Sequence, residues 1–148
     1  MVANEALAAY CPDLNEWPES WRYDDSDVAP GQRIVECLKP FLLHLLNSGL
    51  SPPTLRRHRD NLWLFGGEII RDLWETPKLR KRPLEDLIAA AVDDDGGPWL
   101  SHRQSEAEQR SFDSTCRKLC RFLQGVPDIA QPAPTASRSR KGVKGTVE

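Results

Sequence analysis

The chain has 148 residues, of which 39% are hydrophobic and 28% are charged, and its formal net charge is −2. This length fits one ordinary domain, and the apolar content with five tryptophans excludes a wholly disordered protein. No apolar stretch is long enough for a membrane span, and the N-terminus lacks the pattern of a signal peptide. We therefore expect a cytoplasmic protein whose four cysteines are thiols: Cys11, Cys37, Cys116 and Cys120.

Charge is unevenly distributed along the chain. Residues 1–30 contain one arginine and seven acidic residues, whereas residues 51–82 contain eight basic and four acidic residues. Residues 83–110 are again acidic, and residues 111–125 are basic. Basic charge is thus localised where an anionic partner could bind. The same segregation suggests, as a hypothesis, that the acidic segment masks the basic face.

Prolines among acidic residues predict an irregular arm over residues 1–30, with one short helix over residues 4–10. The arm contains the aromatic residues Trp17, Trp21 and Tyr23. We expect these side chains to attach the arm to the domain, because aromatic rings bury large apolar areas.

Two long helices are predicted next. Apolar residues at helical spacing predict the first over residues 32–47, where Pro40 either kinks the helix or marks the start of its regular part. The second begins with Ser51 as N-cap and Pro52 at the first helical position, and it ends at Thr76. The start of the second long helix therefore has the residue types that favour a helix N-terminus.

Further helices are predicted over residues 83–92 and 105–124, with a loop over residues 93–98 between them. Gly66 and Gly67 lie in the middle of the second long helix. Each costs about 1 kcal/mol relative to alanine, so the pair indicates a close crossing or a break.

No strand pattern is present, so the fold class is all-α, a single bundle of four main helices. The expected organisation is the arm over residues 1–30, a helical domain over residues 31–125 and a basic, disordered tail over residues 126–148. The tail is rich in Pro, Ser, Ala and Gly and has no apolar periodicity, which is typical of disorder.

The last predicted helix carries a row of basic residues. Arg110, Arg117 and Arg121 fall with Ser114 on the side opposite the apolar residues, and Lys118 lies beside them. Arginine forks match phosphate oxygens, so this row is suited to an anionic partner. The alternative is a solvated outer face.

The second long helix begins with Arg56, Arg57 and Arg59 near its N-terminus. A helix N-terminus binds phosphate well, whereas the helix dipole disfavours cationic side chains there, so three arginines suggest a role other than helix stability. In the alternative, Arg57 is solvated and Arg59 covers the core with its aliphatic stem. We expect His58 to be a partly buried, hydrogen-bonded side chain and not a catalytic base.

Motifs for metal binding or catalysis are weak. Cys116 and Cys120 lie one helical turn apart and could form a zinc site with Cys37 and His44, but no C-x-x-C knuckle or H-x₃₋₅-H pair is present. The aspartates of residues 93–95 lack the later ligands of a calcium loop. Because no phosphate loop or catalytic motif occurs either, we expect no metal, no cofactor and no enzymatic activity.

Three short motifs follow one another along the chain. They are Leu38-x-x-Phe41-Leu42, then Ser48-Gly49-Leu50-Ser51-Pro52-x-Thr54-Leu55-Arg56-x-His58-x-x-Asn61-Leu62, then Ser114-Thr115-Cys116-Arg117-Lys118-Leu119-Cys120-Arg121-Phe122-Leu123. This order resembles the N-terminal core-binding domain of tyrosine recombinases, the phage integrases, over residues 34–124.

The resemblance implies a SAM-like helical bundle that clamps one side of duplex DNA with helix N-termini and basic faces. It implies contacts from Thr54 and its neighbouring arginines on the second long helix and from Thr115 and its basic neighbours on the last helix. With the basic row included, the expected DNA-binding residues are Thr54, Arg56, Arg57, Arg59, Arg110, Thr115, Arg117, Lys118 and Arg121.

The chain departs from this family in its catalytic features. Family members continue into a catalytic domain with a His-x-x-Arg pair and a tyrosine nucleophile. No His-x-x-Arg occurs in this sequence, and its tyrosines, Tyr10 and Tyr23, both lie in the arm. We therefore expect no strand cleavage by this chain.

We expect a non-catalytic DNA-binding domain that contacts duplex phosphates, an accessory or remnant of a mobile element. Its expected partners are duplex DNA and a recombinase or other protein, with no membrane and no small-molecule substrate. The alternative is a helical protein–protein interaction module with no nucleic-acid role. Exposed Trp63 or Trp74 would favour that alternative, whereas a contiguous basic face joining the second and last helices would favour DNA.

Overall fold

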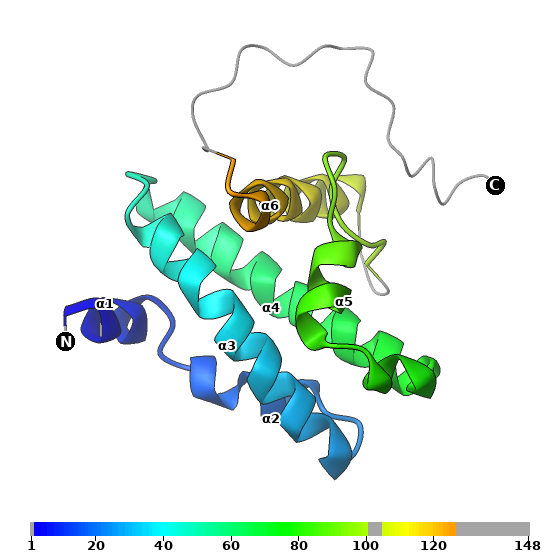
Figure 1. The fold of residues 1–148 in the computed structure, drawn as a ribbon. Coiled ribbons are helices and arrows are strands. Elements are labelled where there is room, and N and C mark those ends of the chain that lie inside the picture. The colour runs from blue at the N-terminus through cyan, green and yellow to red at the C-terminus, as the bar shows by residue number, and fades with distance from the viewer. Residues whose placement is uncertain (1, 101–104, 127–148) are drawn as a thin grey trace. The chain divides into compact units, whose positions relative to one another are not determined.

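The computed structural model describes residues 2–100 and 105–126, and within these ranges the chain is all-α, as expected (Figure 1). The only non-helical pairing there is an isolated bridge between Asp93 and Gly96. The α-helices are α1 (Val2–Tyr10), α2 (Trp17–Trp21), α3 (Val28–Leu46), α4 (Pro52–Glu75), α5 (Leu84–Ala91) and α6 (Glu106–Gln124). Three 3₁₀ turns lie between them: η1 (Leu14–Glu16), η2 (Asp25–Asp27) and η3 (Pro77–Lys81). The tail that we expect to be disordered lies outside the described residues, except for Val126.

The chain forms two compact units, residues 1–90 and residues 91–148. This division differs from the expected one, in which residues 1–30 are an arm and residues 31–125 are a single domain. Each unit is described below by itself.

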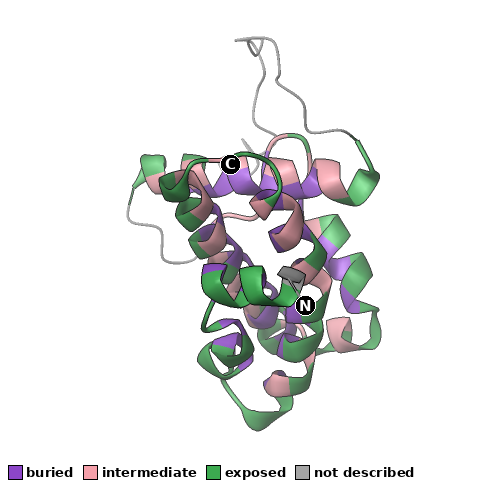
Figure 2. Ribbon diagram, turned by 90° about the vertical axis from the view of Figure 1, so that its left-hand side faces the viewer, coloured by how far each residue is buried: buried purple, intermediate pink, exposed green. Residues whose placement is uncertain are grey.

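The first unit is built on α3 and α4, two helices that contact each other along their apolar faces (Figure 2). The turn between them contains Gly49, whose φ of 73° lies in the left-handed region that glycine adopts without strain. Helix α3 begins at Val28, four residues before the predicted start, and continues through Pro40. The fully buried side chains of this helix pair are Ile34, Leu38, Phe41, Leu42, Leu45, His58, Leu62, Phe65, Ile70 and Leu73.

The arm contains the short helix expected over residues 4–10, as α1, and it is more regular than expected because α2 and two 3₁₀ turns follow. Helices α1 and α2 contact α3, and α2 also contacts α4. Trp17 and Trp21 are 2% and 6% exposed, so the arm contributes aromatic rings to the core of the first unit. The expectation that aromatic residues attach the arm is therefore confirmed for these two. Burial of such rings offsets the low helix propensity of the arm's prolines and acidic residues.

The two glycines in the middle of α4 mark a close approach, and the helix does not break there. A Cβ atom at Gly66 would collide with the indole ring of Trp21. The indole Nε1 of Trp21 donates a hydrogen bond to the carbonyl of Trp63, at 2.9 Å. The glycine therefore lets the arm's tryptophan lie directly on the backbone of α4.

In the second unit, a strap over residues 93–100 packs on α6. The side chain of Gln109 accepts a hydrogen bond from the Leu100 N–H at 2.9 Å and donates one to the Pro98 carbonyl at 3.0 Å. The buried carboxylate of Asp113 accepts from the Gly97 N–H at 3.1 Å. Two polar side chains of α6 thus satisfy backbone groups that the strap would otherwise bury unpaired.

Candidate nucleic-acid interface

The first candidate surface is the N-terminus of α4. Ser51 caps this helix, and its Oγ accepts a hydrogen bond from the Thr54 N–H and donates one to the Thr54 Oγ1. The first turn contains no acidic residue. Arg56 and Arg57 follow with exposed side chains, and neither is in an ion pair with another described residue. This helix start therefore presents two cationic side chains and one hydroxyl group to solvent or to a partner.

Arg59, one of the expected DNA contacts, has partners inside the fold. Its Nη1 donates a hydrogen bond to the Tyr10 carbonyl at 3.0 Å, and its Nε lies 3.1 Å from the carboxylate of Asp60. The Tyr10 hydroxyl in turn donates to the Leu55 carbonyl at 2.6 Å, and burial raises its pKa well above the ordinary value. These contacts fasten the end of α1 to α4.

His58 is fully buried, whereas its position near the apolar stripe predicts only partial burial. It lies one residue from Arg57, yet the two side chains have opposite exposure because successive helical residues are rotated by about 100°. A fully buried imidazole serves packing and not contact with a partner.

The second candidate surface lies on α6. Ser105 caps its N-terminus through a hydrogen bond from the Glu108 N–H, and Gly125 ends it in the left-handed conformation. One side of the helix is buried and includes Phe112, Cys116 and Leu119. Among the expected contacts on the other side, Arg110 is exposed, whereas Arg117, Lys118 and Arg121 are half-buried.

Thr115 is fully buried, so the DNA contact that the resemblance implies for it is wrong. On a helix, Thr115 lies only about 60° around the axis from Phe112, at the border of the apolar stripe. Arg117 is also partly used within the second unit, because its Nη1 donates to the Asp95 carbonyl at 3.4 Å. The remaining cations of the row are suited to an anionic partner.

The aspartates of the strap form a turn, as expected. The carboxylate of Asp93 accepts hydrogen bonds from the N–H groups of Asp95, at 2.8 Å, and Gly96, at 3.1 Å. A carboxylate that closes its own turn in this way is a common turn device. Among the described residues, no group of three or more His, Cys, Asp or Glu side chains is arranged to hold a metal ion.

Three of the four thiols have raised pKa values. All four cysteines are free, which agrees with the expectation of thiols. Burial, with Asp13 nearby, raises the pKa of the Cys11 thiol to about 12. Burial also raises the pKa values of Cys37 and Cys120. Thiols with raised pKa values are poor nucleophiles at neutral pH.

A further functional candidate is a set of exposed aromatic residues, of which the sequence analysis identified only the tryptophans. The rings of Tyr23 and Trp74 stack with centroids 5.5 Å apart, and these side chains are 53% and 49% exposed. Trp63 is 38% exposed on the same helix as Trp74. We call these three residues the aromatic cluster. The sequence shows the tryptophans as possible interaction residues, but the tyrosine's place beside them depends on the path of the arm.

Comparisons with known proteins found no counterpart. No family model, no curated protein and no solved structure matches this chain. Among the described residues, no helix is both long enough and apolar enough to span a membrane.

Proposed function

We propose that the chain is a non-catalytic DNA-binding domain that contacts the phosphates of duplex DNA, an accessory or remnant of a mobile element. The observation that carries this proposal is the start of α4, where Arg56 and Arg57 are exposed in a helix whose first turn has no acidic residue. Arginine forks at one helix end match the geometry and charge of phosphate oxygens. The resemblance to recombinase core-binding domains supports the same ligand.

The cations of α6 supply a second set of phosphate contacts. Arg110, Lys118 and Arg121 lie on its less buried side, and Arg117 is the member that also bonds to the strap. Contacts of this type position a protein on DNA without reading its sequence. We therefore expect salt-sensitive binding with little sequence preference.

The test is fluorescence anisotropy with a labelled mixed-sequence duplex of about 30 base pairs, titrated with salt. The full chain is compared with Arg56→Ala/Arg57→Ala. The control is Arg33→Ala/Lys39→Ala, which removes the same charge from α3, where each side chain is in an ion pair with a glutamate. Both double variants have the same net charge, so a difference between them reports the location of the cations.

The proposal predicts a salt slope that falls by about 2 for the α4 variant, close to 0.9 for each phosphate that the protein no longer neutralises. The control should keep the slope of the unmodified chain. A folded protein that shows no binding at about 50 mM salt would contradict the proposal.

A second candidate function, a protein–protein interaction module, is favoured by the exposure of Trp63 and Trp74. Tryptophan and tyrosine side chains are enriched among the residues that dominate the binding energy of protein interfaces. Under this alternative, Trp74→Ala would weaken a protein complex and Arg56→Ala/Arg57→Ala would leave it intact.

A further inference from the structure

We propose that the aromatic cluster is a binding site for single-stranded nucleic acid, in which unpaired bases stack on Tyr23 and Trp74 and the backbone lies against the adjoining cations. The inference rests on the proposed function and extends it to a second surface and a second form of nucleic acid. It uses residues outside the set expected from the sequence.

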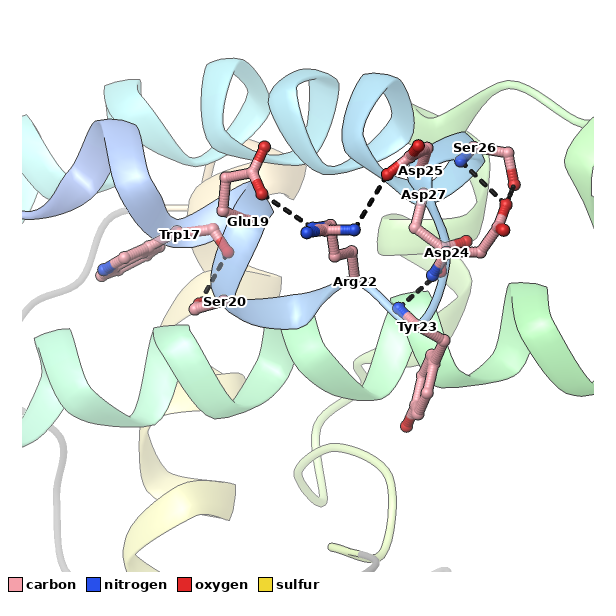
Figure 3. Close-up of polar contacts among 9 residues, drawn as sticks. All are labelled: Trp17, Glu19, Ser20, Arg22, Tyr23, Asp24, Asp25, Ser26 and Asp27. Atoms are coloured by element: carbon pink, nitrogen blue, oxygen red, sulfur yellow. Dashed lines mark hydrogen bonds and ion pairs between the residues drawn. The ribbon is translucent and has the colours of Figure 1, made fainter.

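The path of the arm builds the cluster. The Ser20 Oγ accepts a hydrogen bond from the Trp63 indole at 2.9 Å, and three residues later Tyr23 stacks on Trp74. The arm therefore follows α4 in the direction of its C-terminus. Figure 3 shows the Tyr23 side chain extending from this segment toward the α4 ribbon.

Trp63 and Trp74 lie on the same side of α4. They are separated by 11 residues, which brings the second ring to within about 20° of the first around the helix axis and about 16 Å along it. Gly67 lies between them on this side, and a Cβ atom there would meet the Trp21 indole at 3.4 Å, so the arm's Trp21 covers the helix between the two rings. Arg56 also falls on this side, seven residues before Trp63. Along this side of α4, one basic residue is thus followed by two aromatic residues.

Cations adjoin the stacked pair at its other end. Helix α4 ends at Glu75, and η3 follows at once with the exposed residues Lys78 and Lys81, then Arg82. None of these three is in an ion pair with another described residue. They can therefore neutralise phosphates without breaking an ion pair inside the fold.

Some acidic residues near the stacked pair are in ion pairs, whereas Asp24 and Asp72 are exposed and outside any described ion pair. The Glu75 carboxylate lies 3.0 Å from Arg71, and the Asp25 carboxylate lies 2.9 Å from Arg22. Asp27 is buried and is in an ion pair with Arg80. The three exposed cations outside ion pairs outnumber the carboxylates of Asp24 and Asp72, and the excess of positive charge complements a polyanion whose bases need stacking partners.

Charge and ring geometry together favour single-stranded nucleic acid over a protein partner. Base stacking on aromatic rings accepts any base, and basic residues beside the rings follow the backbone. A duplex offers phosphates but hides its base faces, so it would use the cations and not the rings.

The experiment measures binding of the full chain to a labelled oligo(dT) of about 20 nucleotides and to the mixed-sequence duplex, by fluorescence anisotropy. The variants are Trp74→Ala, the conservative Trp74→Phe, and Lys78→Ala/Lys81→Ala/Arg82→Ala. The control is Leu123→Ala, which removes a similarly exposed apolar side chain from α6. Far-UV circular dichroism verifies that each variant is folded.

Trp74→Ala is expected to weaken oligo(dT) binding between about 5-fold and 150-fold, the range typical for removal of one stacking ring, and to leave duplex binding unchanged. Trp74→Phe should recover part of that affinity. The triple variant should lower the salt slope for oligo(dT) by about 2, close to 0.7 for each cation removed. Leu123→Ala should match the unmodified chain.

Failure of this inference is distinguishable from failure of the proposed function. Duplex binding without oligo(dT) binding, or oligo(dT) binding that Trp74→Ala leaves unchanged, overturns the inference alone. Ring-dependent oligo(dT) binding without duplex binding supports the inference and contradicts the duplex proposal. If an acidic peptide containing Glu and Phe binds as tightly and depends equally on Trp74, the cluster is a protein-docking site and the inference is wrong.

Discussion

The arm and the start of α4 carry charge of opposite sign, and they use it differently. In the arm, the buried carboxylate of Asp27 is in an ion pair with Arg80, and its neighbouring acidic residues have partners within a few residues. At the start of α4, Arg56 and Arg57 are exposed and outside any described ion pair. The arm's charge therefore stabilises the first unit, whereas the charge of the α4 start is open to a partner.

This difference bears on the hypothesis that the acidic arm masks the basic face. Trp17 and Trp21 of the arm are buried in the core of the first unit. An arm that supplies core residues cannot leave its place without exposing them, so deleting residues 1–27 would measure folding and not release of a mask. Single substitutions distinguish a role of the arm in folding from a role in masking the basic face.

The largest expected effect is on the arm. Trp21→Ala removes the ring that lies on Gly66 and the hydrogen bond to the Trp63 carbonyl. We expect the free energy of unfolding to fall by about 3–5 kcal/mol, the usual cost of removing a buried large aromatic side chain. Urea denaturation followed by far-UV circular dichroism measures it. Trp74→Ala, at a half-exposed position, is the control and should cost less than about 1.5 kcal/mol. Equal losses of stability in the two variants would mean that the arm is not part of the core.

The second prediction concerns Asp27. Its Oδ2 accepts hydrogen bonds from the N–H groups of Tyr23, at 2.8 Å, and Asp24, at 3.1 Å, and its Oδ1 is in an ion pair with Arg80. Asp27→Ala leaves these donors without their acceptor, so we expect the free energy of unfolding to fall by about 2–4 kcal/mol in urea denaturation.

Asp25→Ala is the matched control for that decrease. The Asp25 side chain is 97% exposed and its ion pair with Arg22 lies at the surface. Its removal should change the free energy of unfolding by no more than about 0.5 kcal/mol. If Asp25→Ala lowers the free energy of unfolding as much as Asp27→Ala does, the stabilisation comes from the total charge of the arm and not from the buried ion pair.

The third prediction separates two arginines that lie three residues apart. Arg59→Ala removes the hydrogen bond to the Tyr10 carbonyl and should lower the free energy of unfolding by about 1 kcal/mol, with duplex affinity nearly unchanged. Arg56→Ala should lower the duplex affinity and leave the free energy of unfolding nearly unchanged. If Arg59→Ala lowers the salt slope of duplex binding as much as Arg56→Ala does, the assignment of Arg59 to the fold is wrong.

Local sequence signals predicted the long helices well. Ser51 and Ser105 cap α4 and α6, and Gly125 ends α6, as the residue types indicate. The glycine pair in α4 correctly indicated a close approach. These features depend on a few neighbouring residues, so they can be predicted from the local sequence.

Features that depend on distant residues were not predictable in the same way. The arm is helical because Trp17 and Trp21 become buried against helices far along the chain, a gain that outweighs its weak local propensity. The alternative in which Arg59 covers the core already separated it from Arg57, but its hydrogen bond depends on the place of Tyr10, 49 residues away from it in sequence. Thr115 was the exception, since its border position on the helix could have indicated burial.

The smallest expected effect lies at the other end of α4. Burial, followed by the neighbouring carboxylates of Glu68 and Glu75, raises the pKa of Asp72. A carboxyl group with a raised pKa in the folded state binds its proton more tightly there than in the unfolded chain. Its contribution to stability is therefore present at low pH and is lost as the pH rises through the interval above the ordinary carboxyl pKa. The helix dipole acts in the same direction, because a negative charge near a helix C-terminus is unfavourable.

Asp72→Asn removes this charge, so it should stabilise the protein slightly at neutral pH and have no effect at a pH below the ordinary carboxyl pKa. Urea denaturation of both proteins across the acidic range measures the difference. Asp25→Asn is the control, because its exposed carboxylate lies beside Arg22 instead of other acidic residues and it should not stabilise the protein at neutral pH. Stabilisation of Asp72→Asn that is equal at low and neutral pH would show that the gain comes from the amide group and not from removal of the carboxylate's charge.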